Sequence, residues 1–449
     1  MIKLTANDIK KIIKVFSWIC KKNVNPIYNR ITLSCDAQGN QYVSGRNPDT
    51  ALFFKISGTA ETGNPESVTV DFVPFSNALK TTRQDYMVLA TEGLAKFASV
   101  DCSLAFNLDT KDEHVVIKGS LRNDDSKPFS TVASSDLLKA LSTVSYALST
   151  SKCMDSLKGF HLNNYSGKLN IFATDTHRLA VAVVDGDTPE TAEEESFIVL
   201  PAVEKFLREM PEGQVSLYNT NGDTVSFEAD SWGLRISKIN GKSPSYRNVI
   251  PSGYVYGFKA NRYELIKGLT GLSGVVNQST RKVVFGKENG KIILRVPNTN
   301  THSAITDSDA VGHMSFAVDC SYMIEMLKAL DTEYVIVYSG GYEKQLLVNS
   351  GNTTHILATI FKNGWEYCVC GKDLPNPSAY YCCEDCEKNG EAIRGHVNNL
   401  TSDNTPSKTY TVSDKVSKDE VNSLLRKIMS DKGIKTEKEA FDFLISYKF

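Results

Sequence analysis

Five of the ten cysteines lie within one short segment of the chain, and their spacing is suited to metal binding. Cys368 and Cys370 are separated by one residue, and a longer gap leads to Cys382, Cys383 and Cys386. Four thiolates complete the tetrahedral coordination of Zn²⁺, and so small a Cys-rich segment has too little apolar mass to fold without such a centre. Because four thiolates leave no open coordination position, we expect a structural zinc ion and not a catalytic one.

The Cys-rich segment resembles small treble-clef or zinc-ribbon fingers with a Cys-Gly-Lys-x-Leu-Pro and Tyr-Cys-x-x-x-Cys pattern. That resemblance implies the ligand set Cys368, Cys370, Cys382 and Cys386, with Cys383 as an alternative to Cys382. The first knuckle has one intervening residue where two are usual, so the geometry departs from the common pattern. His396 is interpreted as a surface residue, with a role as a fourth ligand as the alternative.

Length and composition indicate a folded, multidomain protein. The chain has 449 residues and a mass of 49.5 kDa, which corresponds to about three domains. Its formal net charge of −2 excludes a uniformly basic coat for nucleic acid, although a basic face balanced by an acidic one fits that total. No long apolar run of the kind that forms a secretory signal or a membrane span is present, so we expect a cytoplasmic protein.

A repeat underlies the order of the predicted elements. Six segments with helical periodicity begin near Asn7, Pro74, Ser134, Pro201, Asn261 and Asp319. Their nearly constant spacing suggests one unit of a helix followed by strands, used six times. The strands do not alternate strictly with the helices, which favours antiparallel α+β units over a parallel sheet. Pairing the units predicts three similar domains.

The first predicted helix has one apolar face and one basic face. Ile9, Ile12 and Phe16 share the apolar side, whereas Lys10 and Lys14 lie opposite. For an isolated helix such a basic side is most simply a solvated surface. Cations nevertheless recur on or beside all six predicted helices.

Three motifs indicate a family. The segment 157–184 contains ATDTHRLA, which closely resembles the ATDGHRLA signature of the bacterial DNA polymerase III β sliding clamps. GKSPSYRNVIP in segment 241–251 is similar to a second stretch of that family at a similar distance downstream, and NVNPIYNRITLS in segment 23–34 follows the first helix as in the family. The resemblance covers about residues 1–362.

The resemblance implies a non-enzymatic processivity factor: a homodimer of three-domain chains that forms a ring around duplex DNA, with helices lining the hole. The cations that would then face the phosphates are Lys10, Lys14, Lys21, Lys22, Lys80, Arg83, Lys139, Lys152, Lys205 and Arg208. Contacts with phosphates would be independent of sequence and weak at physiological salt, so retention would come from closure of the ring.

The family also implies a groove that binds short peptides of a polymerase, a clamp loader and other clients. The matching positions are Leu157, Thr174, Thr176, His177, Arg178, Leu179, Pro244, Arg247, Val249 and Ile356. Thr176 replaces the glycine of the motif, which suggests a changed turn because glycine enters positive φ freely. Ser245 and Asn248 also depart from the family pattern, so we expect an altered peptide preference.

Ring closure in the family joins an edge strand of the first domain to the third domain. By position, the interface residues would be Phe106 and Leu108 on one side and Leu272 and Val275 on the other, although Phe106 and Leu108 equally fit any half-buried strand.

The predicted boundaries follow from the repeat, the motifs and the composition. They are clamp domains at 1–125, 126–252 and 253–363, a zinc-binding module at 364–397, a linker at 398–417 and a helical tail at 418–449. We interpret the module and tail as docking or regulatory elements for an unidentified partner, and the extension together with the altered groove as marks of a clamp from a bacteriophage or mobile element.

Two alternatives stay open at this stage. One is a zinc-dependent DNA-binding or regulatory protein on a clamp-like scaffold that never forms a ring. The other is an enzyme that uses Asp175, His177 and Arg178, but no nucleophile or metal-ligand partner accompanies these residues at a diagnostic spacing, so we predict no catalytic residues.

Overall fold

A computed structural model describes most of the chain up to residue 360. The described residues are 2–20, 25–59, 66–91, 94–107, 121, 127–150, 154–189, 195–219, 222–250, 255–310, 316–339 and 345–360. All of them belong to one compact unit that spans residues 1–387. The predicted zinc module with its five cysteines, the linker, the tail, Lys21, Lys22, Lys152 and Leu108 lie outside the described residues.

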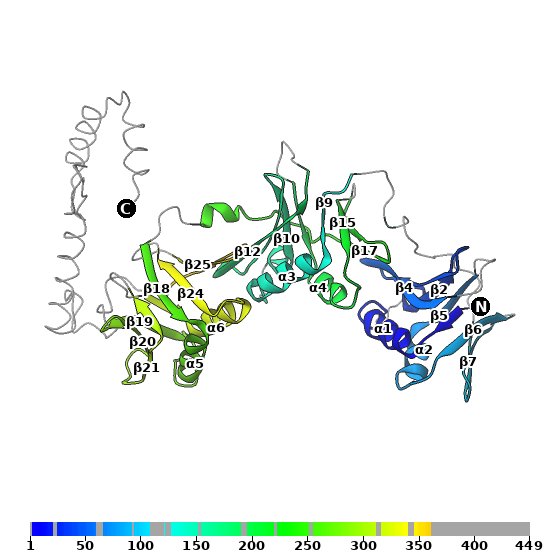
Figure 1. Cartoon of the computed structure of the whole chain (residues 1–449), viewed down its shortest axis with the longest axis horizontal. Helices are drawn as coiled ribbons and strands as arrows, with labels where there is room; N and C mark the ends of the chain where they lie inside the picture. Colours follow the sequence, from blue (N-terminus) through cyan, green and yellow to red (C-terminus); the bar gives the residue numbers. More distant parts are fainter. Residues whose placement is uncertain are drawn as a thin grey trace, which may run out of the picture. The chain divides into compact units, whose positions relative to one another are not determined.

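Six α-helices occur in the described residues, one in each periodic segment of the sequence. They are α1 (Ala6–Phe16), α2 (Phe72–Leu79), α3 (Ser134–Val144), α4 (Ala202–Leu207), α5 (Arg262–Ser273) and α6 (Cys320–Ala329). Four short 3₁₀ helices are η1 (Pro26–Asn29), η2 (Ser145–Ala147), η3 (Asp155–Lys158) and η4 (Tyr246–Val249). The α-helices contact each other in successive pairs, α1 with α2, α3 with α4 and α5 with α6 (Figure 1).

The strands form four sheets whose ladders are antiparallel throughout the described residues. One four-stranded sheet has the order β1-β6-β7-β8, with β1 (Ile2–Leu4), β6 (Tyr86–Thr91), β7 (Leu94–Ala98) and β8 (Ser103–Asn107). The other has the order β21-β20-β19-β23, with β19 (Lys282–Glu288), β20 (Lys291–Arg295), β21 (His302–Ile305) and β23 (Phe316–Asp319). The predicted α+β class with antiparallel sheets is therefore confirmed.

Two larger sheets have nine strands each. The first has the order β13-β9-β15-β16-β17-β4-β3-β2-β5, with β2 (Arg30–Cys35), β3 (Asn40–Arg46), β4 (Thr50–Thr59), β5 (Glu66–Asp71), β9 (Ser130–Ala133), β13 (Gly186–Asp187), β15 (Gln214–Asn219), β16 (Thr224–Glu228) and β17 (Trp232–Ser237). The second has the order β14-β10-β11-β12-β26-β25-β24-β18-β22, with β10 (Phe160–Tyr165), β11 (Lys168–Thr174), β12 (Arg178–Val184), β14 (Glu195–Val199), β18 (Val255–Asn261), β22 (Ser308–Ala310), β24 (Tyr334–Ser339), β25 (Leu346–Ser350) and β26 (Thr353–Leu357).

Each nine-stranded sheet crosses a predicted domain boundary. In the first, β17 pairs with β4 so that Trp232 lies opposite Phe54. In the second, β12 pairs with β26 so that Leu179 lies opposite Ile356. These ladders join successive predicted domains by main-chain hydrogen bonds. The predicted boundaries themselves stay a prediction.

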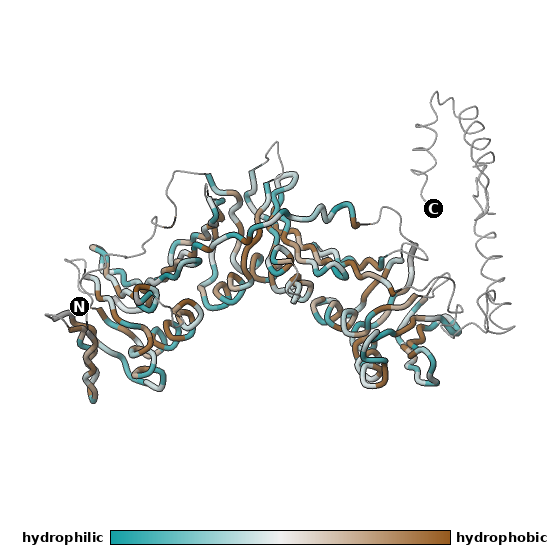
Figure 2. Tube along the Cα trace, turned by 180° about the vertical axis from the view of Figure 1, so that it is seen from behind, coloured by the Kyte–Doolittle hydropathy of each residue, from teal (hydrophilic) through white to brown (hydrophobic). Residues whose placement is uncertain are grey.

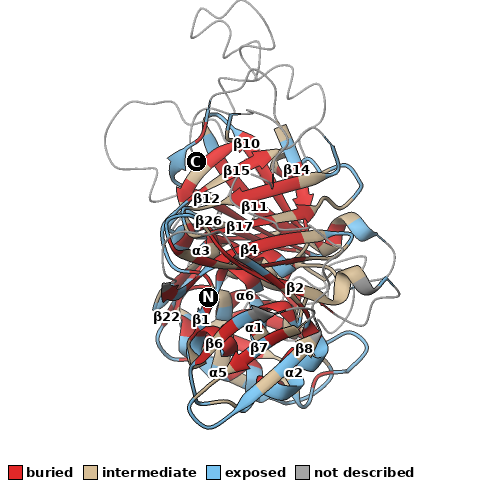
Figure 3. Ribbon diagram, turned by 90° about the vertical axis from the view of Figure 1, so that its right-hand side faces the viewer, coloured by how far each residue is buried: buried red, intermediate tan, exposed pale blue. Residues whose placement is uncertain are grey.

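The first helix shows how the sequence pattern forms the core. Ile9, Ile12 and Phe16 are fully buried, whereas Lys10 and Lys14 are exposed, so the predicted two-faced helix is present. The Phe16 ring packs on Phe54 of β4 at a centroid distance of 6.0 Å. Burying one such side chain contributes about 1.5–3 kcal/mol to folding. Figure 2 shows hydrophobic and hydrophilic residues alternating along the trace, and Figure 3 shows buried residues over much of the sheets and exposed residues in loops and on outer helix faces.

Within the part of the chain that the structure describes, no helix is long and apolar enough to cross a membrane. In the same residues, no three side chains of His, Cys, Asp or Glu are grouped so that they could hold a metal ion. The predicted zinc site lies elsewhere, so this finding does not bear on it.

Candidate functional site

The ATDTHRLA motif forms the tight turn between β11 and β12. The Asp175 carboxylate Oδ1 accepts hydrogen bonds from the backbone N–H groups of His177 (3.0 Å) and Arg178 (2.8 Å). The Thr174 hydroxyl donates to the Arg178 carbonyl at 2.7 Å. Thr176 has φ 78°, the left-handed conformation that glycine adopts most readily. The threonine therefore takes up a glycine-like conformation, at a strain of about 1–2 kcal/mol.

The buried side chain of Arg178 lies in a network of polar contacts between the turn and α6. Its Nη2 is 2.9 Å from Asp175 Oδ2, and its Nη1 donates to the Glu325 carboxylate. Burial by itself would lower the pKa of Arg178, but the hydrogen bonds that its guanidinium donates to Glu325 and Asp175 raise the pKa above its ordinary value. The guanidinium also lies 4.2 Å from the ring centre of Tyr322. Arg178 thus stays charged and holds the turn against α6.

A second layer of the network consists of Tyr146 and His355. The Tyr146 hydroxyl is 3.0 Å from His355 Nδ1, and the two rings stack at 5.9 Å. His355 is fully buried, and burial lowers its pKa to about 4. Burial also raises the pKa of Tyr146. Both side chains are therefore neutral near pH 7. The Tyr146 ring packs beside Arg178, with the guanidinium carbon 5.4 Å from the ring centre.

A cavity of about 290 Å³ opens beside the turn. It is lined by Ser149, Thr150, Met154, Leu157, Asp175, Thr176, His177 and Tyr322. The His177 and Tyr322 rings stack at 5.8 Å and form one wall, and Met154 and Leu157 add apolar surface. The hollow combines these rings and apolar side chains with the polar groups of Ser149, Thr150, Asp175 and Thr176, and it has room for one side chain of a peptide.

The cavity is not arranged for catalysis by Asp175 and His177. The Asp175 carboxylate forms an ion pair with Arg178 and accepts a hydrogen bond from the main-chain N–H of His177. The imidazole of His177 instead stacks on Tyr322. These contacts give both residues a role in shaping the turn and the wall.

The ten predicted groove residues divide between different surfaces. Leu157, Thr176 and His177 line the cavity. Leu179 and Ile356 point to the opposite face of the sheet, where they pack with Phe172, Val181, Tyr246 and Leu347. Side chains alternate between the faces along a strand, so Arg178 and Leu179 cannot line the same face. Thr174 supports the turn through its hydroxyl.

The second motif contributes a different surface. Arg247 stacks on Tyr165 with its guanidinium carbon 3.8 Å from the ring centre. Tyr246 packs on Phe172 at 4.4 Å, while Pro244 and Val249 are exposed. None of these residues lines the described cavity.

All of the predicted DNA-facing cations that the structure describes are exposed, and three of them are paired with acids. Lys14 lies 2.6 Å from Glu209, and Lys139 lies 2.8 Å from Asp331. Arg208 is bound to Glu204 of α4. The exposed cations without an ion pair within the described residues are Lys10, Lys80, Arg83 and Lys205.

The predicted interface residues differ in their exposure. Phe106 is half-buried and packs edge-on against Phe97 at 5.0 Å. Val275 is 51% exposed, whereas Leu272 is 3% exposed and belongs to the core around α5. Of the latter two, only Val275 presents a free apolar surface.

Sequence reasoning missed Met154, Tyr146, Tyr322 and Glu325. Glu325 and Arg178 are separated by 147 residues, and no local pattern connects them. Tyr322 lies in a helix that the periodicity did predict, but nothing in the sequence shows that its ring turns toward the Thr174–Arg178 turn. The repeat predicted the sixth helix itself. It did not predict that this helix lies beside the second predicted domain, because that placement depends on the pairing of β12 with β26.

The described structure has the fold of DNA polymerase sliding clamps. A solved DNA polymerase III subunit beta from Pseudomonas aeruginosa matches with a TM-score of 0.69 at 16% identity, over 80% of this chain and 99% of that one. The solved beta subunit from Thermotoga maritima matches with a TM-score of 0.67 at 18% identity, over 80% of this chain and 99% of that one.

Sequence comparison gives a similar but shorter match. The chain is 24% identical over 239 residues to the beta sliding clamp of Synechococcus elongatus, which covers 51% of this chain and 61% of that relative. The match therefore spans less than two thirds of the relative's length. No family model matches the chain.

Proposed function

We propose that this chain is a DNA sliding clamp, a non-enzymatic processivity factor of which two copies join head to tail around duplex DNA. The observation that carries the proposal is the fold match, which extends over 99% of a solved clamp chain. The six helices and antiparallel sheets of the described residues would supply the scaffold, and the cavity beside the turn at Thr174–Arg178 would supply a place for clients.

Contact with DNA would be weak and independent of sequence. Lys10, Lys80, Arg83 and Lys205 are exposed, without an acidic partner among the described residues, and can approach phosphates. Lys14 and Lys139 are partly neutralised by Glu209 and Asp331. Because each remaining phosphate contact weakens steeply with salt, a closed ring would have to provide the long residence on DNA.

The cavity beside His177 and Tyr322 would hold the apolar anchor of a client peptide from a polymerase or a clamp loader. Its volume of about 290 Å³ is sufficient for one large apolar side chain, and Met154 at 55% exposure can move to admit it. Thr176 in place of a glycine adds a hydroxyl and a methyl group to the rim, which supports an altered peptide preference.

The C-terminal extension would add a structural zinc module that recruits or regulates a further partner. Support comes from the spacing of Cys368, Cys370, Cys382 and Cys386. The solved clamp from P. aeruginosa matches only 80% of this chain, so the extension has no counterpart there. That difference also supports a bacteriophage or mobile-element source.

Native mass spectrometry combined with solution scattering tests the assembly. The proposal predicts two copies per particle and an envelope with a central opening wide enough for a duplex. A monomer at micromolar concentration would contradict it and would favour a clamp-like DNA-binding protein that forms no ring. A compact dimer without an opening would contradict it as well.

A further inference from the structure

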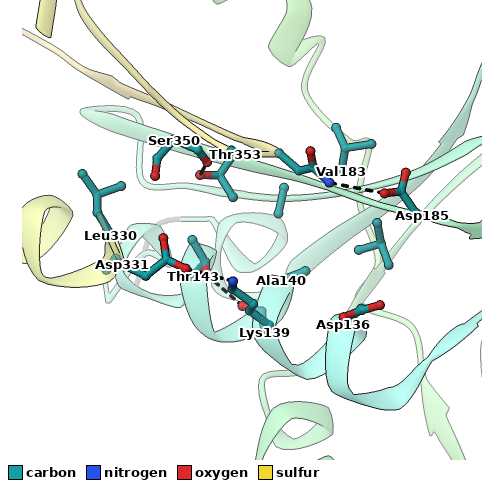
Figure 4. Close-up of a pocket in the computed structure, with 15 residues that line it drawn as sticks. Asp136, Lys139, Ala140, Thr143, Val183, Asp185, Leu330, Asp331, Ser350 and Thr353 are labelled. Atoms are coloured by element: carbon teal, nitrogen blue, oxygen red, sulfur yellow. Dashed lines mark hydrogen bonds and ion pairs between the residues drawn. The ribbon is translucent and has the colours of Figure 1, made fainter. Parts of the chain in front are cut away.

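Two ion pairs connect successive predicted domains in the same manner. Lys14 of α1 lies 2.6 Å from Glu209, which follows α4. Lys139 of α3 lies 2.8 Å from Asp331, which follows α6, and Figure 4 shows this pair beside a pocket lined by both elements. In each case a lysine on the first helix of one predicted domain forms an ion pair with an acid that follows the second helix of the next predicted domain in sequence.

The positions of these residues repeat along the chain. Glu209 and Asp331 are each the second residue after their helix, since α4 ends at Leu207 and α6 at Ala329. Lysine is the sixth residue of the first helix in all three predicted domains, at Lys11, Lys139 and Lys267. Burial lowers the pKa of Lys11, and the negative charges of Asp8 and Glu209 oppose this lowering only in part. The paired lysine of α1 is Lys14, its ninth residue, so what repeats at both junctions is the position of the acid and its pairing with a lysine of the first helix.

The third copy of the repeat lacks the acid. Lys267 is exposed and forms no ion pair with any described residue. The second residue after α2, which ends at Leu79, is Thr81. Thr81 lies next to Lys80 and close in sequence to Arg83, and all three are exposed.

We propose that the junction between two copies of this chain is the one junction without the lysine–acid pair, and that Thr81 sets its affinity. The inference rests on the proposed head-to-tail assembly. If α5 of one copy meets the loop after α2 of the next with the geometry of the other junctions, Lys267 faces Thr81, Lys80 and Arg83. Like charges then meet where the other junctions have an attractive pair, which weakens the dimer at low ionic strength.

Sedimentation of the full chain with Thr81→Glu tests this inference, and Thr81→Gln serves as the uncharged control of the same size. At about 50 mM salt, where screening is weak, Thr81→Glu should lower the dissociation constant of the dimer about three- to tenfold. The reason is that the dimer gains one surface ion pair at each of its two junctions. The gain should shrink at about 500 mM salt. Thr81→Gln should leave the constant within about twofold of the parent, since it adds no charge.

A second substitution identifies the partner of the new acid. In the Lys267→Ala background, Thr81→Glu should give little gain over Lys267→Ala alone, which by itself already removes the like-charge contact with Lys80 and Arg83. Equal constants for the glutamate and glutamine variants, or a gain that survives Lys267→Ala, would overturn the inference while leaving the ring intact. If every variant and the parent stay monomeric, the ring and the inference both fall.

Discussion

The guanidinium carbon of Arg178 lies 4.2 Å from the centre of the Tyr322 ring, and this contact joins the turn before β12 to α6. Tyr322 also stacks with His177, so one ring links the Arg178 side chain to the wall of the cavity. A client peptide that enters the cavity would therefore touch a wall whose position depends on the contacts of the buried Arg178 side chain.

Tyr322→Ala should weaken the binding of a labelled peptide that ends in a large apolar side chain by about tenfold, because both the ring wall and the cation–π contact are lost. Tyr322→Phe keeps the ring and should stay within about twofold. Fluorescence anisotropy measures the affinities. Tyr334→Ala, at a 39% exposed tyrosine that does not line this cavity, is the matched control. Equal losses at positions 322 and 334 would contradict the assignment of the cavity as the peptide site.

Thr176→Gly should raise the free energy of unfolding by up to about 1 kcal/mol. Relief of left-handed strain at a β-branched residue exceeds the extra chain entropy that glycine gives the unfolded state. Urea denaturation followed by circular dichroism provides the measurement. Asn289→Gly is the control, since Asn289 also has a positive φ of 51° but asparagine tolerates that conformation. A loss of stability at position 176 would show that the threonine side chain contributes contacts that outweigh its strain.

Acid should destabilise the fold between about pH 6.5 and pH 4. Burial lowers the pKa of both His355 and His161 to about 4, so the unfolded chain binds protons in this range and the folded chain does not. The contribution of each histidine to the free energy of unfolding is fully present above the pKa of the unfolded state. As the pH falls toward the folded pKa, each histidine loses a contribution on the order of 3 kcal/mol. His355→Asn should reduce the pH dependence measured by urea denaturation at several pH values. The exposed His302→Asn should leave it unchanged, and an unaltered slope for His355→Asn would refute the buried-neutral assignment.

Metal analysis of the purified full chain should find about one zinc per chain, since a four-thiolate site binds one ion. Cys370→Ser should remove most of the zinc. Comparing Cys382→Ser with Cys383→Ser identifies the third ligand: the preferred ligand set predicts loss in the first variant and retention in the second. A chain that contains no zinc when prepared without chelators would refute the metal site.

The sequence carried the repeat and much of the local structure. Hydrophobic periodicity located six helices, as in α1 with Ile9, Ile12 and Phe16 buried, because a helix against a sheet must bury one face. The motif around Thr176 predicted that Leu157, Thr176 and His177 share a surface, and the three residues line one cavity. The changed turn expected from threonine in place of glycine is not seen at Thr176, whose φ of 78° is glycine-like. The spacing of cysteines predicted a zinc site that lies outside the described residues.

Long-range pairing was beyond the reach of sequence patterns. The Leu179–Ile356 ladder and the Arg178–Glu325 ion pair join residues far apart in the chain, and side chains of their type occur at many positions. Strand alternation explains why Leu179 and Ile356 do not line the cavity as predicted, because adjacent residues on β12 face opposite sides of the sheet. Exposure likewise separated Val275 from Leu272 only once the core around α5 was known.

Retention on circular DNA tests encirclement most directly. The full chain is loaded onto nicked circular duplex with an extract that supplies a clamp loader and ATP, and the complex is isolated by gel filtration in high salt. The account predicts that the protein stays on the circle at a salt concentration that abolishes phosphate contacts, and that it is released when a restriction enzyme linearises the DNA. Release at the same rate from circular and linear DNA would contradict it.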